Sequence, residues 1–204
     1  MSVLIVDYNL SNLGSIRRAL EECGVFPVVS DDPGRLKAAS RIVLPGVGSF
    51  ADGMANIRRM GWAPALQEAV REEHVPLLGI CLGMQLLAER GDEGGAVEGL
   101  GLIPGDVRRF VPEDSSTRIP HVGWNEVWQV PGIRLFEGVP DRSDFYFVHS
   151  YHFIPRSKEH VLSTTPYCGG FISAIGVGSV LGVQFHPEKS GRPGLQILKN
   201  FLKV

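Results

Sequence analysis

The first half of the chain alternates between short apolar runs and segments whose apolar residues lie three or four positions apart. The apolar runs predict buried strands at residues 3–6, 26–29, 41–44 and 76–80. Helical spacing predicts helices at residues 11–23, at 52–73 with a break around Gly61 and Pro64, and at 82–90. This alternation indicates parallel strands joined by crossover helices.

The second half has a different pattern, in which short apolar runs follow one another closely. It predicts a closing helix at 193–202 and strands at residues 107–110, 126–130, 145–151, 161–165, 171–177 and 180–185. No repeat or linker divides the sequence. We therefore predict one α/β domain over residues 1–204, with a mixed, mostly parallel central sheet flanked by helices. Ligands of such sheets bind at the carboxyl ends of the parallel strands.

Composition narrows the class of protein further. The 204 residues are 44% hydrophobic and 21% charged, with a formal net charge of -2, as in ordinary globular proteins. Charges of both signs are mixed, which argues against nucleic-acid or membrane binding. The N-terminus has no basic leader, and the most apolar stretch is shorter than the ~20 residues of a membrane span. We expect a soluble, cytoplasmic protein.

The chain has three cysteines, Cys23, Cys81 and Cys168. This odd, sparse set predicts neither a disulfide framework nor a zinc site. It suits a reducing compartment, in which a reactive thiol remains available. We expect no bound metal and no cofactor.

The strongest candidate for chemistry is Cys81, in Gly79-Ile-Cys81-Leu-Gly83. The segment lies where a predicted strand meets a predicted helix, which is the pattern of a nucleophile elbow. Such a turn would place the sulfur at the positive end of a helix, where a thiolate is favoured. It would also aim the Leu82 N–H at a developing oxyanion. The alternative is a buried cysteine that only packs, which the flanking glycines make less favourable.

The motif Gln184-Phe-His186-Pro-Glu188 follows the last predicted strand. Because residues two apart in an extended chain point the same way, we expect the His186 and Glu188 side chains to lie together. A carboxylate beside one imidazole nitrogen fixes the tautomer and leaves the other nitrogen free to accept a proton from sulfur. A solvated turn is the alternative. No other histidine has a carboxylate in this position.

A glycine loop, Pro45-Gly46-Val47-Gly48, follows the third predicted strand. With Ala51 it matches a loose dinucleotide-binding fingerprint, but that fingerprint belongs after the first strand of its fold. We prefer a second interpretation, in which the Val47 N–H is an oxyanion donor opposite that of Leu82.

These motifs, in this order, resemble those of the class I glutamine amidotransferases, a family with a flavodoxin-like α/β fold. Within that family, three further blocks are similar to the glutaminase subunits of imidazole glycerol phosphate synthase: Pro120-His-Val-Gly-Trp-Asn125, Tyr146-Phe-Val-His-Ser-Tyr151 and Phe185-His-Pro-Glu-Lys-Ser190. The resemblance covers the whole chain. It departs near the start, where the family has Asp-Tyr-Gly-x-Gly-Asn and this chain carries Asn9 and Ser11 in place of the two glycines.

The resemblance implies that glutamine is hydrolysed to glutamate and ammonia. Cys81 would attack the side-chain amide to form a γ-glutamyl thioester, while His186 would protonate the leaving ammonia and later activate water. Glu188 would orient His186. The resemblance also implies a set of residues that bind glutamine: Gly48, Gln85, Glu93, Ser150 and Tyr151.

Ammonia must be kept from water to remain a nucleophile, and the chain has no P-loop or obvious phosphate site for a synthase reaction. The resemblance implies a heterodimer with a (β/α)₈-barrel cyclase subunit, which makes imidazole glycerol phosphate and aminoimidazole carboxamide ribotide in histidine biosynthesis. Four residues match positions at or near that interface: Asn12, Trp124, Tyr146 and Lys189.

Such glutaminases are nearly silent without a loaded partner. The glycines on both sides of Val47 suggest a peptide flip that turns its N–H away from the site in the resting state. Three other functions stay open: a subunit of another amidotransferase, such as one serving vitamin B6 or tryptophan synthesis, a stand-alone γ-glutamyl hydrolase, and a binding module with an inactive triad.

Overall fold

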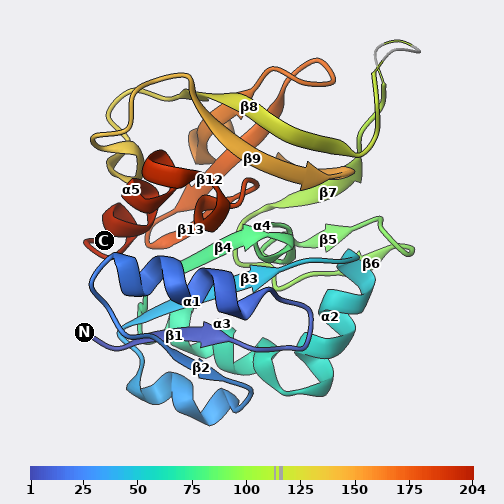
Figure 1. The fold of residues 1–204 in the computed structure, drawn as a ribbon. Helices are drawn as coiled ribbons and strands as arrows, with labels where there is room; N and C mark the ends of the chain where they lie inside the picture. The colour runs from blue at the N-terminus through green and yellow to red at the C-terminus, as the bar shows by residue number, and fades with distance from the viewer. Residues whose placement is uncertain (113, 115–116) are drawn as a thin grey trace.

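The computed structural model describes residues 1–112, 114 and 117–204 (Figure 1). Within these residues, nine strands form one mixed sheet in the order β2-β1-β3-β4-β13-β12-β11-β8-β9. The first five in this order run parallel, and the remaining pairs are antiparallel. Its strands are β1 Val3–Val6, β2 Val28–Ser30, β3 Arg41–Gly46, β4 Leu77–Cys81, β8 His121–Gln129, β9 Ser143–His149, β11 Val161–Thr165, β12 Phe171–Val177 and β13 Val180–Val183.

Helices cover both faces of this sheet, as the sequence predicts. They are α1 Leu13–Glu22, α2 Phe50–Arg59, α3 Trp62–Arg71, α4 Leu82–Leu86 and α5 Gly191–Phe201. Short 3₁₀ turns are η1 Pro33–Ala38, η2 Arg134–Phe136, η3 Lys158–His160 and η4 Pro187–Lys189. No helix in the described part of the chain combines the length and the apolar character needed to cross a membrane.

The inner parallel strands β1, β3, β4 and β13 are buried on both faces, whereas the edge strand β2 is largely exposed. Successive side chains of a strand point to opposite sides, so a strand with a helical layer on each side is apolar throughout. Leu4 and Val6 of β1 pack in one hydrophobic core with α2, α3 and α4. Val3 and Ile5 pack in the other core with α1 and α5. The continuous apolar run is therefore what a strand between two helical layers requires.

A second, smaller sheet was not predicted. It has the order β10-β7-β5-β6 and consists of β5 Arg90–Gly91, β6 Val97–Glu98, β7 Gly105–Arg109 and β10 Tyr151–Pro155. Two of its strands have only two residues, too few to give a period-two pattern. The remaining prediction errors concern boundaries.

Two boundary errors matter for the site. The helix predicted at 82–90 ends at Leu86, and Arg90 already belongs to β5. The strand predicted at 145–151 is two strands, β9 and β10, separated by Ser150. The chain changes sheets at this residue, which an uninterrupted apolar pattern cannot indicate.

The tight packing of α4 against β3 leads to a prediction about stability. A Cβ on Gly83 would overlap the backbone carbonyl oxygen of Leu44, so we expect Gly83→Ala to lower the free energy of unfolding by about 3 kcal/mol. Gly14→Ala is the control, because Gly14 lies in α1 and a Cβ there would meet no atom within 4 Å. That control should stabilise the protein by about 0.5–1 kcal/mol. Urea unfolding of both variants measures the difference, and equal effects would contradict the packing argument.

Candidate active site

Three neighbouring parallel strands bring the predicted catalytic segments together. β4 lies between β3 and β13 in the sheet, and the carboxyl ends of parallel strands meet at one edge. β3 ends at Gly46, immediately before Val47, and β4 ends at Cys81. β13 is followed by the segment that carries His186. The topology therefore collects residues that lie far apart in the sequence.

Cys81 occupies the elbow that the sequence predicts. It has φ 54° and ψ -111°, a left-handed backbone conformation that non-glycine residues rarely adopt. The turn is so tight that a Cβ on Gly79 would lie 2.6 Å from the carbonyl oxygen of Gly83. α4 begins at Leu82, so the Leu82 N–H is one of the first-turn donors that have no partner within the helix.

His186 and Glu188 form the predicted pair. His186 Nδ1 lies 2.7 Å from Glu188 Oε1, and both side chains are only 3% exposed. The reason differs from the prediction, because Pro187–Lys189 is a 3₁₀ turn rather than extended chain. The other ring nitrogen, Nε2, is buried and makes no hydrogen bond within the described residues.

The protonation of His186 follows from its neighbours. Burial alone would lower the pKa of His186, but the interaction with the neighbouring Cys81 and the hydrogen bond to Glu188 outweigh it and raise the pKa to about 10. The imidazole next to Cys81 therefore carries a proton at neutral pH. This proton is available for a leaving group.

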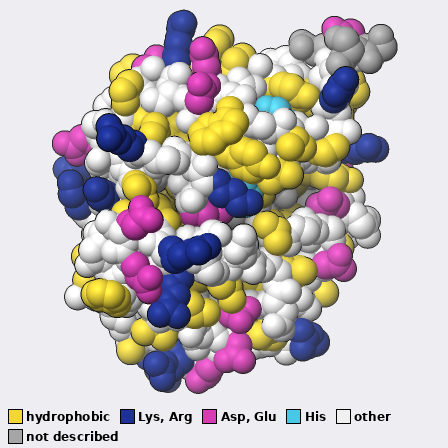
Figure 2. All heavy atoms as spheres, in the orientation of Figure 1, with side chains coloured by type: hydrophobic (Ala, Val, Ile, Leu, Met, Phe, Trp, Pro, Cys, Tyr) yellow, Lys and Arg dark blue, Asp and Glu magenta, His cyan; other side chains and the backbone are white. Residues whose placement is uncertain are grey.

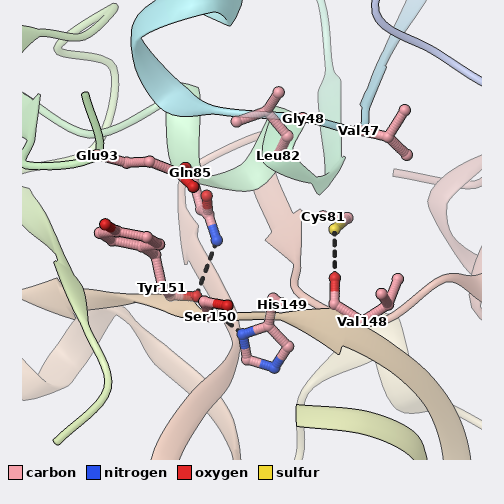
Figure 3. Close-up of a pocket in the computed structure, with 10 residues that line it drawn as sticks. All are labelled: Val47, Gly48, Cys81, Leu82, Gln85, Glu93, Val148, His149, Ser150 and Tyr151. Carbon is pink, nitrogen blue, oxygen red and sulfur yellow. Dashed lines mark hydrogen bonds between the residues drawn. The ribbon is translucent and has the colours of Figure 1, made fainter. Parts of the chain in front are cut away.

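A cavity of about 220 Å³ opens at Cys81 (Figure 3). In Figure 3, Cys81 and Glu93 lie toward opposite ends of the view. His186 and Glu188 are not among the described residues that line the cavity. The lining residues are Val47, Gly48, Cys81, Leu82, Gln85, Glu93, Val148, His149, Ser150 and Tyr151.

Gln85 is buried and joins two sides of the pocket. Its Nε2 donates to the carbonyl oxygen of Tyr151 and to Oε1 of Gln184, both at 2.9 Å. Gln184 Nε2 in turn lies 3.6 Å from Cys81 Sγ. The Cys81 thiol also lies 3.9 Å from the carbonyl oxygen of Val148. Polar contacts thus fix both the nucleophile and the wall opposite it.

The Glu93 carboxylate is tied to the start of α2 by a backbone hydrogen bond. Its Oε2 accepts a hydrogen bond of 2.9 Å from the Phe50 N–H, at the start of α2. Burial raises the pKa of Glu93, although the Phe50 hydrogen bond acts in the opposite direction. The carboxylate is held in place and faces the pocket.

The Val47 N–H points away from the predicted oxyanion site. It donates to the carbonyl oxygen of Leu10 at 2.8 Å. Ser11 reinforces this arrangement, because its hydroxyl donates to the carbonyl oxygen of Pro45 at 3.1 Å. The loop 45–48 is therefore tied to the segment in which this chain departs from the family pattern.

The four predicted interface residues lie outside the pocket. Trp124 is 58% exposed and lies beside Tyr146, with ring centroids 6.1 Å apart. Lys189 Nζ is 5.4 Å from the centre of the Tyr146 ring. Asn12 is exposed at the start of α1, and its side chain makes no capping hydrogen bond.

The sequence analysis missed Val148, His149 and Gln184. His149 and Gln184 are buried polar residues within apolar strand patterns. A polar residue at a position that the pattern predicts to be buried is the signal that could have identified both. Val148 contributes a backbone carbonyl, for which the sequence offers no signal. Among the described residues, no cluster of His, Cys, Asp or Glu is arranged to bind a metal ion.

An α/β sheet that carries a thiol on a strand-to-helix elbow, next to a histidine–carboxylate pair, is the architecture of the thiol-dependent hydrolases. The chain belongs to the glutamine amidotransferase class-I family, whose model matches residues 4–204.

Similar proteins and structures agree with this assignment. The imidazole glycerol phosphate synthase subunit HisH of Moorella thermoacetica is 50% identical over 98% of this chain and 93% of its own length. A subunit of the same name, HisH 1, from Methanococcus maripaludis is 46% identical over 99% of both chains. Among solved structures, PurLQS from Thermotoga maritima aligns with a TM-score of 0.78 at 22% identity, covering 99% of this chain and 97% of the other. This last similarity concerns the fold.

Proposed function

We propose that this chain hydrolyses glutamine to glutamate and ammonia, and that it delivers the ammonia to the cyclase subunit of an imidazole glycerol phosphate synthase. The hydrolase activity is inferred from the His186–Glu188 pair, which lies beside Cys81 with its strained backbone conformation. The names of the relatives support the synthase assignment. An odd, sparse set of cysteines suits a reducing compartment, so we place the reaction in the cytoplasm.

The proposed reaction begins when the Cys81 thiolate, whose proton has passed to His186, attacks the side-chain amide carbon of glutamine. The C–N bond breaks, and the proton on His186 Nε2 goes to the leaving nitrogen, which departs as ammonia. His186 then takes a proton from water, whose oxygen attacks the thioester and releases glutamate. Glu188 holds the imidazole through Nδ1 at 2.7 Å throughout both steps.

The pocket has the polarity that glutamine requires. The amide end would lie at Cys81, and the α-ammonium would lie at Glu93, whose carboxylate is fixed by Phe50. Gly48, Gln85, Ser150 and Tyr151 would contact the parts between these ends. A carboxylate at one end and a thiol at the other would select an amino acid with an amide at the right distance.

The Leu82 and Val47 N–H groups are the proposed oxyanion donors. Because Val47 donates to Leu10 in this structure, we interpret the loop 45–48 as being in a resting state. Activation would rotate the peptide so that the Val47 N–H faces the pocket. Loss of one such donor raises a barrier by about 3–4 kcal/mol, which is enough to keep a hydrolase nearly silent.

The proposed docking surface for a (β/α)₈-barrel cyclase is the outer face of β8 and β9. Figure 2 shows hydrophobic side chains gathered over this part of the molecule. The surface includes Val122 at 57% exposure, Trp124 at 58% and Val148 at 36%, with Tyr146 and Lys189 beside them. Apolar and aromatic groups exposed together are typical of protein interfaces. Asn12 would contribute at the edge.

The central test is glutamate release from glutamine in the presence of the cyclase subunit and its nucleotide ligand. We expect Cys81→Ala to lower kcat by about 10⁴-fold or more, since the nucleophile is lost. Cys23→Ala is the matched control, because that half-buried thiol contacts the carbonyl oxygen of Leu195 and does not line the pocket. Its rate should stay within about twofold of that of the unaltered chain.

Two outcomes would contradict the proposal in different ways. An unchanged rate in Cys81→Ala would indicate an inactive triad. Full activity of the chain alone, unaffected by the cyclase, would indicate a stand-alone hydrolase.

The resting-state interpretation predicts the effect of removing the Ser11 hydroxyl. Ser11→Ala loses the hydrogen bond to Pro45, so we expect partner-free hydrolysis to rise about fivefold, while the partner-activated rate stays the same. Ser143→Ala is the matched control, since its hydroxyl also donates to a proline carbonyl, that of Pro140, but away from the pocket. A partner-free rate that rises equally in both variants would refute the role of Ser11.

The docking surface predicts a separate effect on binding. Trp124→Ala should weaken the cyclase complex by about 2 kcal/mol, or roughly 30-fold in Kd, because a large exposed aromatic side chain is removed. Phe26→Ala is the control, since Phe26 is 86% exposed but precedes β2 at the opposite edge of the sheet. Calorimetric titration measures both. Equal affinities would exclude β8 and β9 as the docking surface.

A further inference from the structure

Two buried histidines form a pair at the pocket wall, which His149 itself lines, and the proposed reaction gives them no role. His121 of β8 and His149 of β9 face each other in the strand register and are 4% and 7% exposed. His121 Nδ1 lies 3.2 Å from His149 Nε2. Aromatic rings surround the pair, with Tyr167 stacked on His121 at a centroid distance of 4.0 Å.

The partners of these rings determine which nitrogen carries each proton. His149 Nδ1 lies 2.8 Å from the carbonyl oxygen of Tyr151, which can only accept, so Nδ1 must be protonated. A neutral His149 therefore accepts at Nε2, and His121 must donate to it from its own Nδ1. This leaves His121 Nε2 as an acceptor.

Asn125 completes the sequence of donors. Its Nδ2 lies 3.2 Å from His121 Nε2, and its Oδ1 accepts from the Glu126 N–H at 2.9 Å. Because the backbone N–H fixes the amide oxygen, the amide nitrogen must face the histidine. The result is a directed chain of hydrogen bonds from Asn125 through His121 and His149 to the Tyr151 carbonyl, named here the imidazole chain.

Burial keeps the imidazole chain neutral. It lowers the pKa of His121 to about 4 and is the main reason that the pKa of His149 falls to about 3. An extra proton on either ring would replace an acceptor with a donor. The arrangement of protons is therefore stable at neutral pH.

The imidazole chain ends on the carbonyl that also holds Gln85. Tyr151 oxygen accepts from His149 Nδ1 and from Gln85 Nε2 (Figure 3). This carbonyl lies just after Ser150, where the chain leaves the large sheet and enters the small one. Backbone pairing passes here from one sheet to the other: β9 pairs with β8 as far as His149, the Phe110 N–H donates to the Ser150 carbonyl oxygen at 2.9 Å, and Tyr151 pairs with Arg109 of β7. The two side-chain hydrogen bonds to the Tyr151 carbonyl add to this pairing and link it to Gln85.

We propose that His121 and His149 are positioning residues, which hold the pocket wall from Val148 to Tyr151, and Gln85 with it, against the bound substrate amide. The inference rests on the proposed glutaminase function. It gives His121 and Asn125 a role at the pocket wall, whereas the exposed Trp124 between them belongs to the proposed docking surface.

The test compares two histidine variants by steady-state glutamine hydrolysis with the cyclase subunit bound. His121→Phe keeps a ring of similar size but removes the two hydrogen bonds that His121 makes within the imidazole chain. We expect its KM for glutamine to rise about tenfold, because the wall loses support, while kcat falls less than about threefold. His152→Phe is the matched control, since His152 stacks on Phe110 in the same region, but its ring takes no part in the hydrogen bonds of the imidazole chain. Its KM should be unchanged.

A spectroscopic readout does not depend on how the variants fold. In the unaltered protein at pH 7, ¹⁵N–¹H correlation of the imidazoles should show His121 and His149 both protonated at Nδ1 alone. Protonation at Nε2 of either ring would overturn the proposal. So would a KM that is unchanged in His121→Phe, or raised equally in His152→Phe. If the unaltered chain hydrolyses no glutamine with the cyclase subunit bound, the proposed function is wrong. If the chain is active but either ring is protonated at Nε2, only the inference about His121 and His149 is wrong.

Discussion

The close approach of the backbone around Cys81 is the constraint on which the rest of the site depends. A non-glycine residue at φ 54° costs of the order of 1–3 kcal/mol, and it persists only where its surroundings leave no alternative. The surroundings of Cys81 are closely packed backbone segments. Gly79 packs against the backbone of Gly83 across the elbow, and Gly83 packs against the carbonyl group of Leu44. Gly46 lies against the Leu82 side chain, so the loop that follows β3 and the helix that follows β4 are packed as one unit. Cys81 can face the pocket because Gly46, Gly79 and Gly83 have no side chains that would push these backbone segments apart.

The second requirement is that His186 reaches Cys81 from a different part of the chain. This is achieved by the sheet order, in which the last strand, β13, inserts beside β4 and runs parallel to it. Both strands then end at the same edge, and the His186 segment turns back as a 3₁₀ turn under β9. The His186 N–H donates to the Tyr146 carbonyl at 2.9 Å, and the hydroxyl of Ser190 binds the His186 carbonyl. The backbone on both sides of the imidazole is therefore fixed before any substrate binds.

The sequence alone predicted those features that depend on residues close together in the chain. The glycines around Cys81, the His-Pro-Glu motif and the alternation of strands and helices predicted the elbow, the paired side chains and the mixed sheet, which the structure confirms. The sequence did not predict features that depend on a hydrogen-bond partner far away in the chain. The acceptor of Val47, Leu10, and the role of Gln184 depend on contacts between remote segments. The small sheet also escaped prediction, because its shortest strands are defined by their neighbours rather than by their own pattern.

One strand, β9, connects the outer aromatic surface to the catalytic groups. Tyr146 and Val148 turn their side chains outward, toward the proposed docking surface, while their carbonyl oxygens face His186 and Cys81. The side chain of His149, between Val148 and Ser150, points to the opposite face and belongs to the imidazole chain. This division follows from the alternation of side chains along a strand. A partner bound to the outer face would therefore contact a strand whose backbone reaches both His186 and Cys81.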